Sequence, residues 1–183
     1  RFNNSKLLDK LSFSEAIELA YYGAKVIHPK TIQPLQIKNI PLQVRSFINL
    51  ENSGTIITDC KISYNIPSYI VKENQILVSI SDKNLSFIVE DHLSYIFSLL
   101  AKNNLSVNLM QNSAVSFSLC IDSSKNSIIF LSELKDKFDV LYNSNLTLHT
   151  IRHYDKHSLD SFIKNKKIIL EQKSRNTVQL IVE

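Results

Sequence analysis

The second half of the chain alternates strand and helix patterns in one fixed order. Apolar residues recur every second position where a strand is expected and at helical spacing where a helix is expected. In chain order the pattern gives a strand, a helix, two strands, a helix and a strand, over residues 76–81, 89–100, 105–110, 114–121, 128–134 and 138–142. This βαββαβ order is that of a ferredoxin-like unit. It predicts an α+β module over residues 76–143.

The same pattern then begins again and stops early. Residues 146–152 indicate a strand, residues 158–164 a short helix, and residues 167–172 and 177–182 two more strands. A βαββ unit leaves one position of its sheet open, and we expect an earlier segment such as residues 68–72 to fill it. The prediction is a tandem of ferredoxin-like modules. The second covers residues 144–183, and residues 59–75 form a connecting segment.

The first part of the chain has a different character. All four prolines and both glycines precede residue 68. Ser12 and Glu15 form a capping-box pattern that predicts a helix, and Gly23 lies where that helix should end. A short strand over residues 25–27, a helix over 29–37 that Pro34 should kink or shorten, and a strand over 42–47 follow. This order suggests a small α/β unit over residues 1–58.

Several classes of function are disfavoured by composition. The two glycines, Gly23 and Gly54, are too few for a glycine-rich loop around a phosphate. The net charge of +4, from 21 Lys and Arg against 17 Asp and Glu, is spread along the chain and does not predict nucleic-acid binding. No apolar run approaches the roughly 18 residues of a membrane span. With two cysteines and no disulfide framework, a cytoplasmic location is expected.

The sequence offers few candidate residues for catalysis, metal binding or ligand binding. The five histidines are scattered, without zinc-ligand spacing, and for each a structural role is favoured over metal binding. Cys60 and Cys120 have no adjacent base, so neither is expected to be a nucleophile; Cys120, on the less apolar face of a strand, is expected to be a packing residue. Lys25, at a helix-to-strand turn, could point at an anion or be an ordinary surface lysine. Polar residues around a strand end could bind a small molecule or simply form a turn; they are Ser106, Asn108, Gln111, Asn112 and Ser113.

Several strings resemble a known family. Residues 11–20 (LSFSEAIELA), 22–30 (YGAKVIHPK), 40–47 (IPLQVRSF) and 53–55 (SGT) are similar to the end of the kinase domain of aspartate kinases. Residues 104–109 (NLSVNL) and 113–116 (SAVS) resemble the effector-binding segment of the first ACT module in that family. The resemblance implies tandem ferredoxin-like ACT modules after an α/β remnant of an amino-acid-kinase domain. In the family one module interrupts the other, which agrees with the incomplete second unit.

The resemblance also implies an activity for the longer enzyme. It would transfer phosphate from ATP to the β-carboxylate of L-aspartate, with Mg²⁺ expected, as a step toward lysine, threonine and methionine. Lys25, Val26 and Arg1 would lie near the nucleotide. The catalytic residues would belong to a preceding kinase domain, so this chain alone should be inactive and should need no cofactor.

The effector site implied by the resemblance binds an amino acid and lies in a homodimer of ACT modules. The implied residues are Leu85, Asp91, His92, Leu93, Ser106, Val107, Asn108, Ser113 and Ala114. The lysine-sensitive pattern has acids where Asn108 and Ala114 stand, and Glu90 or Asp91 could supply the charge instead. Lysine is expected ahead of threonine. The alternatives are a dimerisation module without effector and an RNA-binding ferredoxin-like domain, although the basic, aromatic strand motif of the latter is missing.

Overall fold

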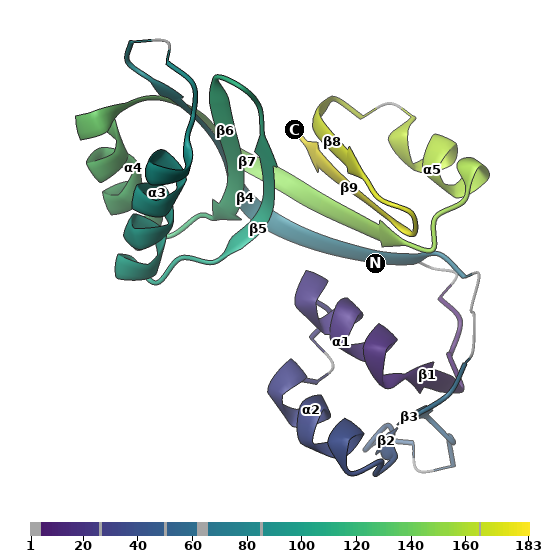
Figure 1. Cartoon of the computed structure of the whole chain (residues 1–183). Helices are drawn as coiled ribbons and strands as arrows, with labels where there is room; N and C mark the ends of the chain where they lie inside the picture. The colour runs from purple at the N-terminus through teal and green to yellow at the C-terminus, as the bar shows by residue number, and fades with distance from the viewer. Residues whose placement is uncertain (1–4, 26, 50, 62–65, 85, 165) are drawn as a thin grey trace. The chain divides into compact units, whose positions relative to one another are not determined.

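The computed structural model describes residues 5–25, 27–49, 51–61, 66–84, 86–164 and 166–183. The chain divides into two compact units, Arg1–Ile66 and Pro67–Glu183, whose elements are labelled in Figure 1. Each unit has its own core. In the described part of the chain, no helix combines the length and the apolar character that crossing a membrane requires.

The first unit is a small three-stranded sheet with two helices. Strand β3 (Thr55–Thr58) lies in the middle, parallel to β1 (Lys10–Ser12) and antiparallel to β2 (Leu42–Val44). Helices α1 (Phe13–Tyr22) and α2 (Pro29–Ile37) supply part of the core. Its buried apolar residues include Phe13, Ala16, Ile32 and Ile57.

The ends of α1 follow the predicted local chemistry. Ser12 is the N-cap, and its Oγ accepts the backbone N–H of Glu15 at 3.1 Å. Gly23 ends the helix with φ +113°, a conformation that glycine adopts without a steric penalty. Both predictions are confirmed.

Other predictions for the first unit need correction. Lys25 and Ile27 lie in a turn and a bend, so the short strand predicted there is wrong; Val26 lies outside the described residues. Helix α2 continues to Ile37 despite Pro34. Strand β2 ends at Val44, short of the predicted residue 47, and strands β1 and β3 were not predicted. These strands have three or four residues each, too few to give a clear alternation.

The second unit is one six-stranded antiparallel sheet in the order β5-β6-β4-β7-β9-β8. Its strands are β4 (Ser68–Asp82), β5 (Val107–Asn112), β6 (Ser116–Asp122), β7 (Phe138–Arg152), β8 (Ile168–Lys173) and β9 (Thr177–Val182). Its helices are α3 (Glu90–Lys102), α4 (Lys125–Lys137) and α5 (Lys156–Ile163).

Two long strands are shared by two ferredoxin-like modules. The order β5-β6-β4-β7 is that of a complete βαββαβ unit, and β4-β7-β9-β8 repeats it with β4 in the fourth position. Ser68–Lys72 pairs with Leu148–Arg152 and so fills the position that the βαββ pattern left open. Separate strands were predicted over 68–72 and 76–81, and over 138–142 and 146–152. Each pair is instead one continuous strand of 15 residues.

The two faces of this sheet are buried differently. One face packs under α3 and α4 through alternate residues of β4, namely Ile76, Val78 and Ile80. The other, which we call the inner face, carries Leu77, Leu109, Leu146, Leu148 and Ile181 in one core. Strands β5 and β9 are not neighbours in the sheet, yet Gln179 Nε2 on β9 donates to the backbone carbonyl of Asn108 on β5 at 3.4 Å, so the two halves of the sheet fold toward each other.

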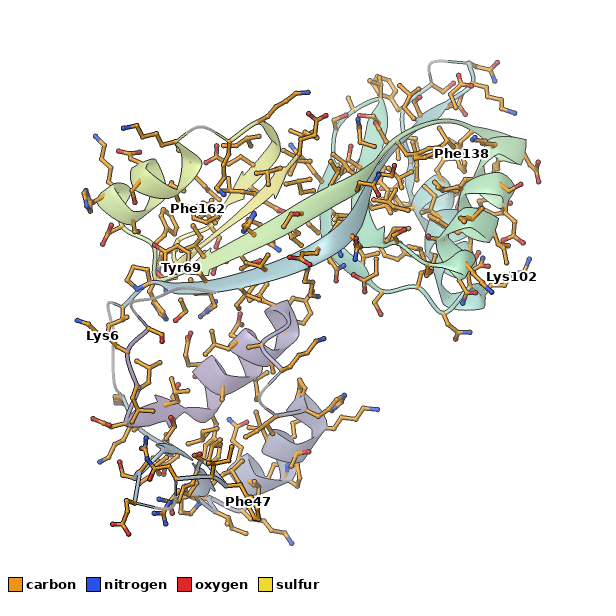
Figure 2. The ribbon with its side chains drawn as sticks, turned by 180° about the vertical axis from the view of Figure 1, so that it is seen from behind. Lys6, Phe47, Tyr69, Lys102, Phe138 and Phe162 are labelled. Carbon is orange, nitrogen blue, oxygen red and sulfur yellow. The ribbon has the colours of Figure 1, made fainter. Side chains whose placement is uncertain are left out.

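The helices lie outside this folded sheet. Figure 1 shows α3 and α4 beside one half and α5 beside the other. Beneath α5, Phe162 packs on Tyr69 with ring centroids 5.7 Å apart (Figure 2). The inner face is therefore the place where the two modules meet.

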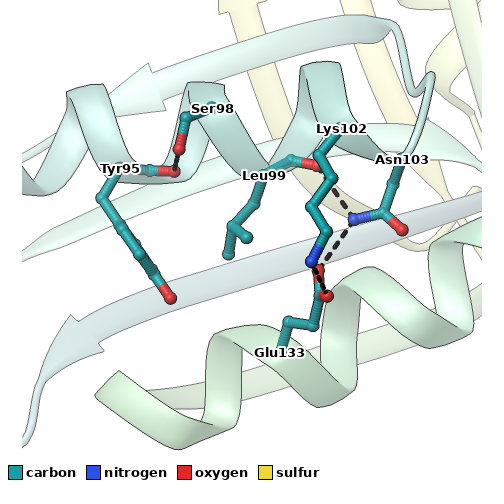
Figure 3. A network of polar contacts seen from close by, with 6 residues as sticks. All are labelled: Tyr95, Ser98, Leu99, Lys102, Asn103 and Glu133. Atoms are coloured by element: carbon teal, nitrogen blue, oxygen red, sulfur yellow. Dashed lines mark hydrogen bonds and ion pairs between the residues drawn. The ribbon is translucent and has the colours of Figure 1, made fainter.

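A polar clamp fixes α3 against α4 (Figure 3). Asn103 Nδ2 donates to Leu99 O at 3.0 Å and to Glu133 Oε2 at 2.9 Å, and Lys102 pairs with the same carboxylate. The hydrogen bond from Lys102, more than any other contact, lowers the pKa of Glu133. The clamp sets the end of α3 and thereby the start of β5.

Candidate functional site

The predicted effector residues fall into two groups at opposite ends of β5. The first, which we call the helix-start group, contains Asp91, His92, Leu93, Ser113 and Ala114. The backbone N–H of Ile88 donates to Ala114 O at 3.0 Å, which ties the segment before α3 to the β5–β6 turn. Leu85, also predicted here, lies outside the described residues.

The helix-start group combines a helix N-terminus with two exposed acids. Helix α3 begins after Val89, and Glu90 and Asp91 occupy its first turn. Backbone N–H groups at such a terminus can bind a carboxylate, whereas the acids can pair with an ammonium. The helix-start group can therefore bind both charged ends of a free amino acid, the carboxylate at the helix N-terminus and the ammonium at an acidic side chain.

Two other side chains of the helix-start group already have partners in the chain. His92 packs its ring edge-on against Phe138, with centroids 5.5 Å apart, and its Nε2 lies 3.9 Å from Asp82 Oδ2. The hydroxyl of Ser113 accepts the backbone N–H of Ser116 at 3.2 Å, inside the turn. These contacts hold the shape of the site.

The second group centres on Asn108 and forms what we call the Asn108 network. Asn108 Nδ2 donates to Gln75 Oε1 at 2.8 Å and to Asp122 Oδ1 at 2.9 Å, while Lys72 Nζ donates to Asn108 Oδ1 at 2.8 Å. Gln75 Nε2 donates to Asp122 Oδ1 at 2.7 Å and to the carbonyl of Glu73 at 3.0 Å. The side chain of Asn108 thus uses three of its four hydrogen-bonding positions within the chain.

The Asn108 network lies beside the inner face. Gln75 is 1% exposed, and the buried Cys120 thiol donates to its Oε1 at 3.4 Å. Burial, and next the charge of Asp122, raise the pKa of Cys120 to about 12, so this thiol stays protonated. Cys120 is a packing residue, as predicted. Of the other predicted residues here, Ser106 is exposed and Val107 packs against the core under α3.

Sequence reasoning missed Lys72, Gln75 and Asp122. Lys72 and Gln75 lie within residues 59–75, which were expected to be a connecting segment and not part of a site. One signal was present: Gln75 immediately precedes an apolar run, at a position that a strand buries.

The two groups are too far apart to be bridged within one chain. Asn108 and Ser113 are separated by five residues, about 16 Å along an extended strand. Even lysine, fully extended, spans only about half of that distance. One bound molecule therefore cannot contact both groups of the same chain.

The nucleotide contacts implied by the resemblance are only partly described. Lys25 is exposed in the turn after Gly23, where its ammonium suits an anionic phosphate, while Val26 and Arg1 lie outside the described residues. Close to it in sequence, Ala24 and Ile27 line a small apolar cleft of about 60 Å³. The other lining residues are Leu11, Ala16, Leu19, Ala20, Ile32 and Ile57. Such a lining suits packing against apolar side chains and offers nothing that binds phosphate.

The described residues contain no group of three or more His, Cys, Asp or Glu side chains that could hold a metal ion. His149 is nevertheless unusual. It lies partly buried on β7, edge-on to Phe162 with centroids 4.8 Å apart, and its Nδ1 has no hydrogen-bond partner among the described residues. Burial, and then the charge of Lys166, lower the pKa of His149 to about 4.

Acid should therefore destabilise the second module through His149. The unfolded chain binds this proton near pH 6.5 and the folded chain only near pH 4, so the free energy of unfolding falls as the pH drops through that window. We expect His149→Leu to remove about 1–2 kcal/mol of this acid-induced loss, after allowance for solvent screening. Melting curves at steps between pH 7 and pH 4 measure it, with His157→Leu on the exposed surface of α5 as control. Equal acid sensitivity in both variants would contradict the role of His149.

The comparisons with known proteins find similarity to amino acid kinases and, among them, to aspartokinases. Residues 1–46 match the amino acid kinase family. The chain is 34% identical over 122 residues to the lysine-sensitive aspartokinase 3 of Escherichia coli, covering 65% of this chain and 26% of that protein. It is 31% identical over 166 residues to the chloroplastic aspartokinase 3 of Arabidopsis thaliana, covering 88% of this chain and 29% of that one.

Solved structures agree in fold. The aspartate kinase of Clostridium acetobutylicum superposes with a TM-score of 0.81 at 22% identity, over 99% of this chain and 46% of that chain. Aspartokinase III of E. coli, in complex with lysine and aspartate, gives 0.74 at 25% identity, over 97% and 43%. The chain spans less than a third of the length of these curated relatives.

Proposed function

Because this chain belongs to the aspartokinase family, we propose that it is the regulatory part of an enzyme that phosphorylates L-aspartate with ATP. The observation that carries the proposal is the pair of ferredoxin-like modules sharing β4 and β7, which follows a segment similar to an amino acid kinase. We assign residues 1–58 to the end of the kinase domain, 76–143 to the first ACT module and 144–183 to the second. Residues 59–75 connect the kinase end to the first module, and Ser68–Lys72 within them supplies the fourth strand of the second module.

In this proposal the phosphate transfer depends on a kinase domain that precedes the region. Lys25 would contribute a positive charge beside ATP, which supplies the phosphate, and Mg²⁺ would be held by residues other than those described here. No catalytic residue is assigned to the chain. Its contribution is control of the reaction.

We propose that two copies of the chain pair through β5. This strand is an edge of the sheet, so one row of its backbone N–H and C=O groups can bond to another strand. Apolar side chains are exposed on and around it; they are Phe87, Val89, Phe97, Met110 and Val115. Burying them against a second copy removes apolar surface from water.

Pairing would also complete the effector site. If two β5 strands run antiparallel about a two-fold axis near Met110 and Gln111, Asn108 of one copy comes opposite Ser113 of the other. The helix-start group and the Asn108 network, separated in one chain, would then face each other across the dimer. We propose that an amino acid binds there, its carboxylate at the start of α3 and its ammonium near Glu90 or Asp91.

The names of the relatives support an amino-acid effector, since one is lysine-sensitive and one solved structure holds lysine. The preference for lysine over threonine stays a prediction, and the contacts of Asn108 argue against it. A dimerisation module without effector is the alternative.

Light scattering and melting curves on the 183-residue chain test the proposal. We expect a dimer at micromolar concentration, and a rise of roughly 5–10 °C in Tm when an effector is present at about 100 times its Kd. Lysine, threonine and methionine are the compounds to test. Met110→Lys, on β5, should abolish both results, whereas Ile128→Lys, on the exposed face of α4, should leave them unchanged. A dimer whose Tm responds to none of these compounds would favour the module without effector.

A further inference from the structure

We propose that Lys72 determines which amino acids bind this chain: its ammonium occupies the Asn108 end of the site, which therefore accepts uncharged side chains and rejects cationic ones. The inference rests on the proposed effector function and adds a specificity-determining residue to it. Lys72 comes from β4, outside every segment that the resemblance assigned to the site.

The first step is the position of Lys72. It lies half-buried on β4, opposite Leu148 of the inner face, and reaches across to β5, where its Nζ donates to Asn108 Oδ1 at 2.8 Å. The Nδ2 of the same amide is already used by Gln75 and Asp122. A ligand that approaches the Asn108 side chain can therefore bond only to the second lone pair of Oδ1. This is the oxygen that already accepts a hydrogen bond from the Lys72 ammonium.

The second step is the repulsion that follows. Two donors on one carbonyl oxygen, each at hydrogen-bond distance, lie about 5 Å apart. A ligand ammonium at Asn108 would thus be held about 5 Å from Lys72 Nζ, in a partly buried place where like charges repel strongly. The carboxylate that hydrogen-bonds within the network is that of Asp122. It lies at Nδ2 of Asn108, whereas Lys72 and the ligand ammonium would share Oδ1.

The third step concerns uncharged ligands. An ammonium carries three donors, and Asn108 is the single acceptor that Lys72 Nζ has among the described residues. Its remaining N–H groups can donate to a hydroxyl oxygen such as that of threonine. An apolar side chain can lie along the methylene stem of Lys72 instead. Both kinds of side chain avoid the charge conflict.

Isothermal titration of the 183-residue chain tests the proposal with L-lysine, L-threonine and L-norleucine. Norleucine resembles lysine without the charge, so the ratio of its affinity to that of lysine isolates the effect of the ammonium. In the unmodified chain we expect norleucine and threonine to bind at least roughly tenfold more tightly than lysine. In Lys72→Met, which keeps the length and removes the charge, the norleucine-to-lysine ratio should fall to about one.

Controls separate this result from general damage. Lys125→Met removes an exposed charge at the start of α4 and should keep the ratio of the unmodified chain. Lys72→Gln provides a second neutral variant should Lys72→Met fail to fold, and the same fall in the ratio is expected.

Two outcomes would overturn the proposal. One is tight lysine binding to the unmodified chain that Lys72→Met leaves unchanged, in which case Glu90 and Asp91 hold the ammonium and the effector function stands. The other is absence of binding by all three amino acids in every variant. That result removes the effector function itself, and the role of Lys72 with it.

Discussion

Replacing Gln75 with glutamate is expected to lower the free energy of unfolding by about 3–5 kcal/mol at pH 7. Gln75 is 1% exposed, and its Nε2 donates to both Asp122 and the carbonyl of Glu73. In the glutamate variant an oxygen takes the place of this donor. A carboxylate would then face a second carboxylate and a carbonyl oxygen at hydrogen-bond distance, with little water to screen the charges.

The loss should depend on pH in a definite direction. Burial and the charge of Asp122 both favour the protonated form of the new carboxyl, so its folded pKa lies above the unfolded value of about 4.3. The destabilisation is therefore absent below that pH and grows as the pH rises through it. Protonated, the variant side chain can again donate a hydrogen bond to Asp122.

Chemical denaturation at pH 7 and pH 4.5 measures this difference against the unmodified chain at each pH. Gln75→Met is the matched control, because it keeps the length of the side chain and adds no charge. Its cost should vary little with pH. A Gln75→Glu variant that is equally destabilised at both pH values would show that lost packing, rather than charge, dominates at this position.

The second large effect is expected from Gly54→Ala, which should unfold the first unit. Gly54 has φ +70°, and a Cβ at this position would lie 2.1 Å from the carbonyl oxygen of Val44 and 3.0 Å from Arg45 Cα. Backbone atoms cannot move aside as a flexible side chain does. Because Gly54 immediately precedes β3, the central strand, any shift disturbs its pairing with β2. We expect a loss of about 2–4 kcal/mol.

Amide hydrogen exchange shows where this loss is felt. Protection should disappear in β1, β2 and β3 and persist in β4 and β7, because the core of the second unit contains no residue of the first. Ser53→Ala, at the exposed neighbouring position, should behave like the unmodified chain. Retained protection throughout the first unit of Gly54→Ala would mean that the turn adjusts without cost.

Local signals in the sequence predicted local structure well. The start of α1 depends on Ser12 and Glu15, three positions apart, and its end on Gly23 alone, so a short window contains the necessary information. The strand and helix order of the first module was readable for the same reason, since each element carries its own periodicity. The ferredoxin-like order of strands is confirmed by the sheet.

The long strands were predicted in pieces because polar residues interrupt them. Asn74 and Asn145 have φ +56° and +58°, values typical of turns, yet the chain continues in the same direction on both sides. The register of β4 against β7 shifts beside Gln75, so the polar stretch is an irregularity inside a strand pair. Strand β4 continues past Asn74 only because it pairs with β7, which lies more than 60 residues later in the chain.

The Asn108 network could not be predicted either, because it also depends on residues that are distant in sequence. Lys72 and Asn108 lie 36 residues apart in sequence, and Gln75 and Asp122 lie 47 apart. Asn108 lies in a segment that resembles an effector-binding motif, but Lys72, Gln75 and Asp122 belong to no motif, and each alone is an ordinary polar side chain. The fold brings them together, and their hydrogen bonds then limit what Asn108 can still bind.

The shared strands β4 and β7 also dictate an order of assembly. Ser68 pairs with Arg152, so the second module closes around a loop that contains the whole first module. Closing a long flexible loop is entropically costly, and a folded first module shortens that loop by joining the end of β4 to the beginning of β7. We therefore expect the first module to form before the second during refolding. Ser68–Lys72 is the first segment of the sheet to be synthesised. It is nevertheless among the last to pair with its partner strand, β7.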